Sequence, residues 1–183
     1  MSIHADFNLF DFNPLTVQHA RERISQAMVD GGRHVEVKVT EFSVQQVLAQ
    51  GSRLLTQPRM VRSGLLEKGH YDVIYCAGLF DYLSDRVCKR LMEIFWALGG
   101  PGAAIVVSNF TPSNPIRGFM DYVVDWRLVY REQGYMETLI PDDCGPEAAR
   151  TELSPDGVEV FLQLRKPDIS TAKGELGGQE LRT

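Results

Sequence analysis

The sequence predicts an α/β protein with a mostly parallel sheet that ends in an antiparallel hairpin. Apolar runs with the length of strands alternate with segments in which apolar residues recur at helical spacing. Two of the runs, 73–77 and 103–107, are continuously apolar, which is typical of parallel strands buried on both faces. Near the C-terminus, Ser-Pro-Asp-Gly at 154–157 separates two further strands and predicts the hairpin.

The first expected element is a short strand at 7–10 that ends on a carboxylate, Asp11. Asn13 can cap the following helix, and Pro14 suits its first turn because the missing N–H would have no partner there. Many nucleotide-binding α/β folds present an acid to the ribose hydroxyls in this way, normally about 20 residues after a glycine-rich loop. Only ten residues precede Asp11, and none is glycine. The sequence therefore suggests a cofactor-binding fold that begins at its second strand.

The next two elements follow from their periodicity. After Pro14, one apolar face at helical spacing continues to about Asp30, where two glycines end the helix. Residues 34–40 then alternate between valine and mostly charged side chains, which indicates an edge strand with one solvent-exposed face.

The remaining elements alternate in the same manner, with glycine, proline and polar residues between them. They are a helix at 44–55, a loop or broken helix at 56–69, a strand at 71–77, a loop at 78–83, a helix at 84–98, a strand at 103–107, a polar loop at 109–115, a helix to about residue 133, and strands at 150–153 and 158–165. From Pro167 onward no apolar period remains, so the tail is expected to be disordered.

Composition limits the possible functions. The net charge of −5 and the pI near 5.4 argue against non-specific nucleic-acid binding. No apolar run approaches the roughly 18 residues of a membrane span, and no signal peptide opens the chain. The three cysteines and four histidines show no metal-ligand spacing, so we expect no metal site and a reducing, cytoplasmic setting.

The order of elements resembles the Rossmann-like class I S-adenosylmethionine-dependent methyltransferases, from their second strand to their seventh. Phe10 to Pro14 is similar to the acid segment of that family, and 71–76 to its fourth strand. Leu98-Gly99-Gly100-Pro101-Gly102 is similar to the turn before its fifth strand. More narrowly, 75–85 together with 112–115 resembles bacterial proteins of 3-hydroxypalmitic acid methyl ester biosynthesis. The match covers roughly residues 7–166.

The resemblance implies S-adenosylmethionine as the cofactor and a small-molecule or fatty-acid-like substrate with a carboxylate or hydroxyl acceptor. It implies that Asp11 binds the ribose hydroxyls, and that the adenine is contacted by Phe12, Glu41, Phe42 and Ser43. Small residues line the methionine end; they are Cys76, Ala77 and Gly78. The catalytic candidates near the acceptor are Asp81, Tyr82 and Asn109. Positioning supplies most of the rate when the acceptor is already a carboxylate.

The chain departs from the family at one point. The family's first strand, its glycine loop and its first helix have no counterpart, so residues 1–166 read as an incomplete domain and 167–183 as a tail. That strand lies between the second and fourth strands of the family's sheet. Either another chain supplies it, as an identical or different partner, or the flanking strands pair directly, or the sequence is a truncated fragment. Activity of the isolated chain is expected to be impaired.

Several alternatives remain at this point. Asp11 can be an ordinary capping acid, and Phe12 and Phe42 can be core residues. A second hypothesis is a non-catalytic remnant of the fold that acts as a binding or assembly module. A third is a nicotinamide-dependent oxidoreductase, which the terminal hairpin disfavours because such folds continue with parallel strands.

Overall fold

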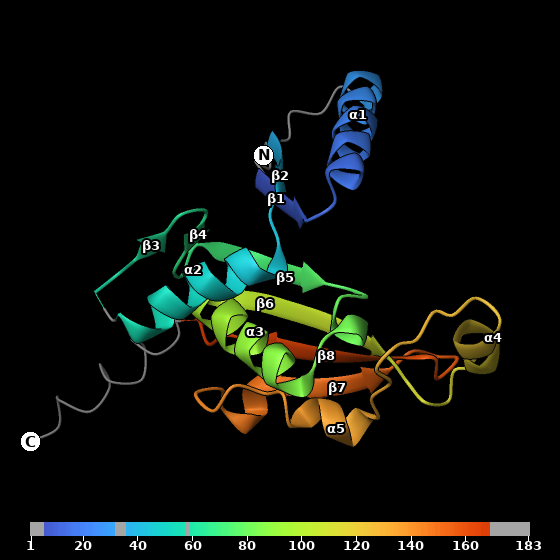
Figure 1. The fold of residues 1–183 in the computed structure, drawn as a ribbon. Helices are drawn as coiled ribbons and strands as arrows, with labels where there is room; N and C mark the ends of the chain where they lie inside the picture. The colour runs from blue at the N-terminus through green and yellow to red at the C-terminus, as the bar shows by residue number, and fades with distance from the viewer. Residues whose placement is uncertain (1–5, 32–35, 58, 169–183) are drawn as a thin grey trace, which may run out of the picture. The chain divides into compact units, whose positions relative to one another are not determined.

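The computed structural model describes residues 6–31, 36–57 and 59–168 (Figure 1). Contacts within the chain divide it into two compact units, residues 1–50 and 51–183, and helix α2 (Val44–Thr56) crosses the boundary. Most of the tail predicted from Pro167 onward lies outside the described residues.

The first unit contains the strand, helix and strand that the sequence predicts at its start. Strand β1 (Asp6–Asp11) leads into helix α1 (Pro14–Gly31), and strand β2 (Glu36–Glu41) returns parallel to β1, with Asp11 opposite Glu41. Residues 34 and 35 of the predicted strand lie outside the described residues. The core of this unit includes Val17 of α1 and Val39 of β2, both nearly inaccessible to solvent.

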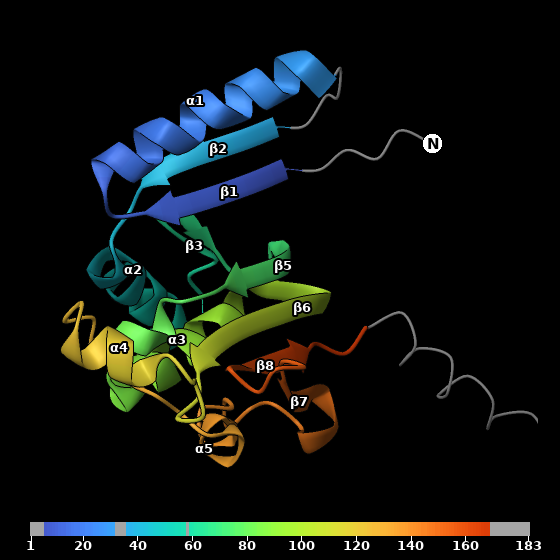
Figure 2. The same cartoon turned by 90° about the vertical axis from the view of Figure 1, so that its right-hand side faces the viewer.

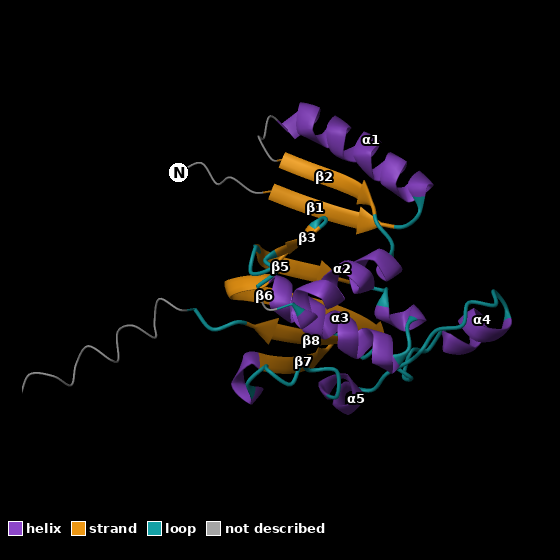
Figure 3. Cartoon of the chain, turned by 60° about the vertical axis from the view of Figure 1, so that its left-hand side comes forward, coloured by secondary structure: helices purple, strands orange, loops and turns teal. Residues whose placement is uncertain are grey.

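The second unit is built on a four-stranded sheet in the order β5-β6-β8-β7 (Figure 3). Strand β5 (Tyr71–Cys76) runs parallel to β6 (Gly99–Phe110), whereas β8 (Glu159–Arg165) runs antiparallel to both β6 and β7 (Ala149–Leu153). The prediction of an α/β fold with parallel strands and a C-terminal antiparallel hairpin is confirmed.

One face of this sheet carries the core. Cys76 of β5, Val107 of β6 and Leu162 of β8 lie side by side in register, and Val107 and Leu162 are fully buried. Helix α3 (Asp85–Leu98) packs on β6 and contributes the buried side chains Cys88 and Leu91. Helix α3 lies beside the sheet in Figure 2, and its buried side chains agree with the apolar stripe that predicts a helix at 84–98.

The other face of β5 contradicts the sequence prediction. The continuous run 73–77 was expected to be buried on both sides, but Val73 and Tyr75 are 65% and 67% exposed. Among the described residues β5 pairs only with β6, so it is an edge strand and lacks the second neighbour that burial of both faces requires.

Two further predictions need correction. The loop expected at 56–69 contains a short antiparallel hairpin, β3 (Arg62–Ser63) with β4 (Leu66–Glu67). The helix expected to run to about residue 133 is only α4 (Arg117–Tyr122), followed by irregular backbone and then α5 (Gln133–Glu137). Single-turn helices also form at η1 (Phe80–Tyr82) and η2 (Pro146–Ala148).

The early end of α4 has a local cause. Asp125 has a φ of 48°, a left-handed conformation that interrupts the helix, and the Trp126 N–H turns back to the carbonyl of Met120. Most of the apolar side chains of the predicted stripe are also exposed, so no packed face stabilises a longer helix; they are Phe119, Tyr122, Val123, Trp126 and Val129.

A close helix contact in the second unit gives a test of the packing. A Cβ on Gly51 of α2 would lie only 2.5 Å from Ile94 of α3, whose β-branched side chain has little rotamer freedom in a helix. We expect Gly51→Ala to lower the free energy of unfolding by about 1–2 kcal/mol, because overpacking outweighs the gain in helix propensity. Urea unfolding measures this change.

Gly118→Ala in α4 is the matched control, because no atom lies within 4 Å of the added Cβ. That variant should be unchanged or more stable by up to about 1 kcal/mol. A Gly51→Ala protein as stable as the Gly118→Ala protein would contradict the packing of α2 against α3.

Candidate functional site

The carboxyl ends of β5 and β6, together with the loop after β5, carry six of the candidate site residues. In open α/β sheets ligands bind at the carboxyl ends of the parallel strands, and these two strands end at the same edge. Cys76 ends β5, and Ala77 and Gly78 follow it. Gly78 has a φ of 73° and no atom within 4 Å of the position of a Cβ, so the turn needs glycine and leaves open space beside its backbone.

Asp81 is the buried acid of this edge. The residue is only 2% exposed, and its Oδ1 accepts a hydrogen bond of 2.7 Å from the Phe110 N–H at the end of β6. Its backbone carbonyl accepts another, also of 2.7 Å, from the Val129 N–H. Asp81 therefore ties the loop after β5 both to β6 and to the segment before α5.

Burial raises the pKa of Asp81 to about 6, because desolvation penalises the charged carboxylate. The Phe110 N–H and the Arg131 guanidinium act in the opposite direction and lower this pKa, whereas the charge of Glu159 raises it further. Asp81 can consequently change its protonation state at mildly acidic pH.

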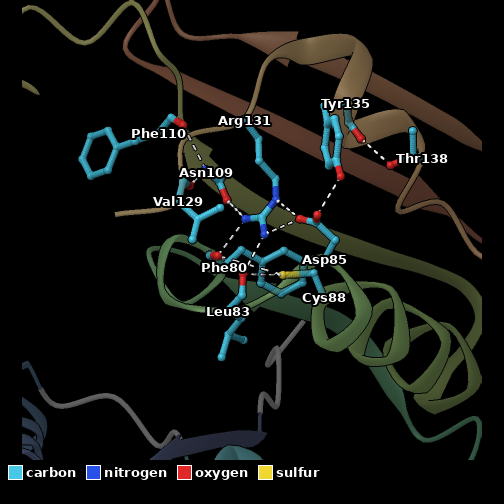
Figure 4. Close-up of polar contacts among 10 residues, drawn as sticks. All are labelled: Phe80, Leu83, Asp85, Cys88, Asn109, Phe110, Val129, Arg131, Tyr135 and Thr138. Carbon is cyan, nitrogen blue, oxygen red and sulfur yellow. Dashed lines mark hydrogen bonds and ion pairs between the residues drawn. The ribbon is translucent and has the colours of Figure 1, made fainter. Parts of the chain in front are cut away.

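Asn109 precedes Phe110, the partner of Asp81, and is fully buried. Both ends of its side-chain amide make hydrogen bonds within the protein (Figure 4). Its Nδ2 donates to the carbonyls of Phe110 and Val129 at 2.9 and 2.8 Å, and its Oδ1 accepts from Arg131 Nη1 at 2.5 Å. The amide thus fixes the backbone around it, and no part of it points to solvent.

Arg131 joins these groups, although the sequence did not single it out. All five of its N–H groups are engaged, since Nη1 also donates to the Phe80 carbonyl, Nη2 donates to the Leu83 carbonyl, and Nε and Nη2 both donate to Asp85 Oδ1 (Figure 4). Its side chain is 1% exposed. A lone arginine between a tyrosine and a glutamate carries no signal that distinguishes it from a surface charge.

Asp85 is the counter-ion of Arg131 and is itself half exposed. Its Oδ2 accepts a hydrogen bond of 2.6 Å from the Tyr135 hydroxyl of α5. That hydrogen bond and those from Arg131 lower the pKa of Asp85, so the acid is charged near neutral pH. The sequence had placed Asp85 at the start of a helix and at the end of the motif 75–85, without assigning a role to it.

Tyr82 differs from its two fellow candidates because it is 56% exposed. Its hydroxyl accepts a hydrogen bond of 2.7 Å from Trp126 Nε1. The segment 116–126 also exposes several apolar side chains. Together with Tyr82 we call them the α4 surface; they are Tyr82, Ile116, Phe119, Tyr122, Val123, Val124 and Trp126, all at least 45% exposed. Of the three catalytic candidates, only Tyr82 is exposed to solvent.

In the first unit, Asp11 ends β1 next to the cap of α1. Its Oδ1 accepts from the Asn13 N–H at 2.7 Å, while Oδ2 has no hydrogen-bond partner among the described residues. Asn13 in turn accepts from the Leu15 N–H, as the predicted cap requires. Phe12 is 66% exposed and so is not a core residue.

The residues that follow β2 lie in the same unit as Asp11. Phe42 is buried, packs against Phe10 with ring centroids 5.3 Å apart, and donates its N–H to the Asp11 carbonyl. Glu41 is exposed. Ser43 and Gln46 exchange hydrogen bonds as a capping box at the start of α2. The structure thus brings Asp11 and Phe42 together at the carboxyl ends of β1 and β2.

A groove of about 910 Å³ in the second unit lies elsewhere. Its walls include Gly69 before β5, Gly99 and Pro101 at the start of β6, and Lys166 after β8, so none of the candidate residues lines it. Among the described residues no group of three or more His, Cys, Asp or Glu could hold a metal ion.

The Arg131 cluster can be tested by substitution. We expect Arg131→Met to lower the free energy of unfolding by at least about 3 kcal/mol, because two carbonyls and the Asn109 amide would lose a buried donor. Denaturant unfolding provides the measurement. Arg127→Met is the control, since Arg127 and its partner Asp125 are at least 80% exposed, and it should change stability by less than about 0.5 kcal/mol. Equal effects of the two substitutions would show that the cluster has no structural role.

The raised pKa of Asp81 predicts a specific pH dependence. A folded-state pKa of about 6, above the usual range of an aspartate, means that the folded protein holds this proton more tightly than the unfolded chain. The contribution of Asp81 to stability is therefore present below about pH 4 and is lost as the pH rises to about 6. Relative to the parent protein, Asp81→Asn should become more stable across this interval in denaturant titrations.

Asp156→Asn should behave in the opposite way. Hydrogen bonds from Ser154 and the Val158 N–H lower the pKa of Asp156, so its carboxylate adds stability that is lost as the pH falls. A stability difference between Asp81→Asn and the parent protein that stays constant from pH 4 to pH 7 would contradict the burial of Asp81.

Comparison with known proteins gives a fold but no family. No family model matches the chain, and no curated protein matches it. In the part of the chain that the structure describes, no helix has the length and apolarity of a membrane span. Solved structures, in contrast, align over most of the chain.

Three of these structures illustrate the likeness. A possible exported protein from Bordetella parapertussis aligns with a TM-score of 0.60 at 16% identity, over 87% of this chain and 53% of its own. An N-methyltransferase from Bradyrhizobium japonicum WM9, in complex with S-adenosylhomocysteine, aligns at 0.51 and 12%, over 90% and 78%. Magnesium protoporphyrin IX methyltransferase from Synechocystis PCC 6803, with the same molecule bound, aligns at 0.54 and 10%, over 90% and 73%.

The chain therefore spans about half the length of the Bordetella protein and about three quarters of the two methyltransferases. At such low identity the likeness concerns the fold alone. The chain has a Rossmann-like α/β fold of the kind found in S-adenosylmethionine-dependent methyltransferases.

Proposed function

We propose that the protein takes part in S-adenosylmethionine-dependent methyl transfer. The observation that carries the proposal is Asp11, an acid at the carboxyl end of a parallel strand and directly before a capped helix, whose Oδ2 has no hydrogen-bond partner within the described part of the chain. It occurs on a fold that aligns with methyltransferases solved with S-adenosylhomocysteine.

The first unit supplies groups suited to a nucleoside. In this proposal Asp11 accepts hydrogen bonds from the ribose hydroxyls through Oδ2, while the exposed ring of Phe12 packs on the adenine. Phe42 holds the Asp11 backbone in place through its N–H, and Glu41 and Ser43 contact the adenine edge. These residues fit the group, since the carboxylate oxygen and the aromatic ring are both available for a ligand.

The second unit supplies groups suited to the methionine end and the acceptor. Cys76, Ala77 and Gly78 allow the cofactor to approach the backbone after β5 closely, because Gly78 has no side chain and the space beside it is open. The bound cofactor would supply an electrophilic methyl group. Asp81 and Asn109 act as positioning residues, because Asp81 Oδ1 and the Asn109 amide make internal hydrogen bonds that hold the loops.

The acceptor that we infer is a small or lipid-like molecule with a carboxylate or hydroxyl. The α4 surface, which includes Tyr82, supports an apolar acceptor, because exposed apolar side chains of this extent commonly mark a binding surface. Resemblance to proteins of 3-hydroxypalmitic acid methyl ester biosynthesis rests on the motifs at 75–85 and 112–115. We place the activity in the cytoplasm, since all three cysteines are free.

The second candidate function is a non-catalytic binding module. It is favoured by the edge strand β5, which among the described residues pairs only with β6, so that the sheet of the second unit lacks a neighbour on that side. For the same reason we expect methyl transfer by the isolated chain to be impaired, even where the nucleoside groups bind.

Calorimetry with S-adenosylhomocysteine and the full chain separates the two candidates. We expect a dissociation constant in the micromolar range, and Asp11→Ala should raise it at least about tenfold, because two ribose hydroxyls lose their acceptor. Glu36→Gln, at the opposite end of β2, removes an exposed acid without touching the site and should leave the constant unchanged. No heat at millimolar ligand would refute the methyltransferase proposal and favour the binding module.

A further inference from the structure

The groove of the second unit lies at the edge of the sheet where β5 and β6 begin and β8 ends (Figure 3). This edge is opposite to the one that carries Cys76 and Asn109. The volume of the groove, about 910 Å³, is in the range of sites that hold small molecules. All the residues that line it belong to the second unit, and we call it the Trp96 groove.

Apolar side chains form much of the wall of the Trp96 groove. Trp96, near the end of α3, is partly buried, and the aliphatic and proline side chains around the groove are Leu55, Val61, Pro101, Pro141 and Pro167. Gly69 has a φ of 66° and no atom within 4 Å of the position of a Cβ, so the space beside it is open. Such a wall suits a ligand with an apolar body.

The charged groups on the α3 side of the groove are paired with one another. Arg90 lies 2.6 Å from Glu93, and Lys89 lies 2.8 Å from Asp142. The fifth charged group of this side, Asp143, is exposed. The side chains of α3 therefore add little net charge to the groove.

Lys166 brings a positive charge to the aromatic wall. Its Nζ donates hydrogen bonds of 2.9 Å to the carbonyls of Trp96 and Gly99, and it lies 5.1 Å from the centroid of the Trp96 ring. A Cβ on Gly99 would lie 3.3 Å from Lys166 Cδ, so the stem of the lysine packs closely on the backbone there. An ammonium has three donors, and the third N–H of Lys166 has no partner among the described residues.

Lys68 adds a second positive charge to the same groove. Its ammonium makes no hydrogen bond or ion pair within the described part of the chain. Burial lowers the pKa of Lys166, and the nearby charge of Lys68 lowers this pKa further. The two cations therefore repel each other, and an anion bound between them would relieve this repulsion and occupy the donors that remain.

We propose that the Trp96 groove binds a small monocarboxylate with an apolar body. Its two oxygens accept hydrogen bonds from the Lys68 ammonium and from the third N–H of Lys166, while the apolar body packs on Trp96 and the prolines. A neutral apolar molecule would leave both cations without a counter-ion. A phosphate has no apolar body for the wall, and its second charge would be repelled by Asp143.

Tryptophan fluorescence tests the proposal on the full chain. The protein has two tryptophans, so in a Trp126→Phe background the emission reports Trp96 alone. Octanoate should change this emission with half-saturation at about 0.1 mM. We expect 1-octanol, which has the same apolar body without the carboxylate, to need at least about tenfold more, and inorganic phosphate likewise.

Matched substitutions locate the carboxylate. In the same background, Lys68→Gln should raise the half-saturation concentration of octanoate at least about fivefold, because the carboxylate loses a charged donor. Lys68 is partly exposed and has no partner to lose, so the fold should tolerate the change. Lys68→Arg keeps the charge and should stay within about twofold of the background. Lys38→Gln removes the same charge from an exposed residue that does not line the groove, and it should have no effect.

Four results would overturn the proposal. They are an unchanged Trp96 emission, equal half-saturation by octanoate and 1-octanol, equal half-saturation by octanoate and phosphate, and equal behaviour of Lys68→Gln and Lys38→Gln. An octanoate response that occurs in the parent protein and vanishes in Trp126→Phe would place the ligand at the α4 surface and would equally contradict the proposal. None of these readouts involves S-adenosylhomocysteine, so this test and the calorimetry succeed or fail independently.

Discussion

The second unit depends on the placement of one buried cation. Arg131, in the segment before α5, directs a fully hydrogen-bonded guanidinium to the loop after β5, to Asp85 of α3 and to Asn109 of β6. Most of its acceptors are backbone carbonyls and an amide rather than a second charge. The planar fork of arginine can reach several acceptors in fixed directions, which the single ammonium of a lysine cannot. Desolvation of such a cation is costly, so it persists only where every donor is satisfied. The loops at the carboxyl edge are therefore held in one arrangement.

The sequence predicted the elements whose periodicity is strong. The strand ending at Asp11, the cap at Asn13, the helix 84–98 and the hairpin around 154–157 all follow from local chemistry and appear in the structure. It failed at the segment after Pro115, where apolar spacing suggested a helix to residue 133. Periodicity reports only that apolar side chains share a face, and a helix there also needs something to pack against. The left-handed conformation of Asp125 could not be predicted, since aspartate tolerates this conformation but does not require it.

The candidate site shows the same division. Asp81, Tyr82 and Asn109 were candidates because the family resemblance implies that they lie near the acceptor, but their environments could not be derived from the sequence. Asp81 and Asn109 face inward and Tyr82 faces solvent, although 81 and 82 are neighbours in the chain. Arg131 escaped notice because its partners lie 22 to 51 residues away and meet it only in the folded chain. A long-range polar cluster has no period, whereas a helix or strand does.

These environments decide which groups can meet a substrate. A side chain whose donors and acceptors are all paired inside the protein can exchange a proton with an acceptor molecule only after those hydrogen bonds break, which costs about 1–3 kcal/mol for each buried group left unpaired. Asn109 is in this position, and Asp81 has one carboxylate oxygen, Oδ1, paired with the Phe110 N–H. Tyr82 has an exposed ring, and its hydroxyl accepts from Trp126 and so keeps its own proton available for donation. An acceptor oxygen that approaches this edge would therefore meet the Tyr82 hydroxyl, while the buried pair keeps the surrounding loops in place.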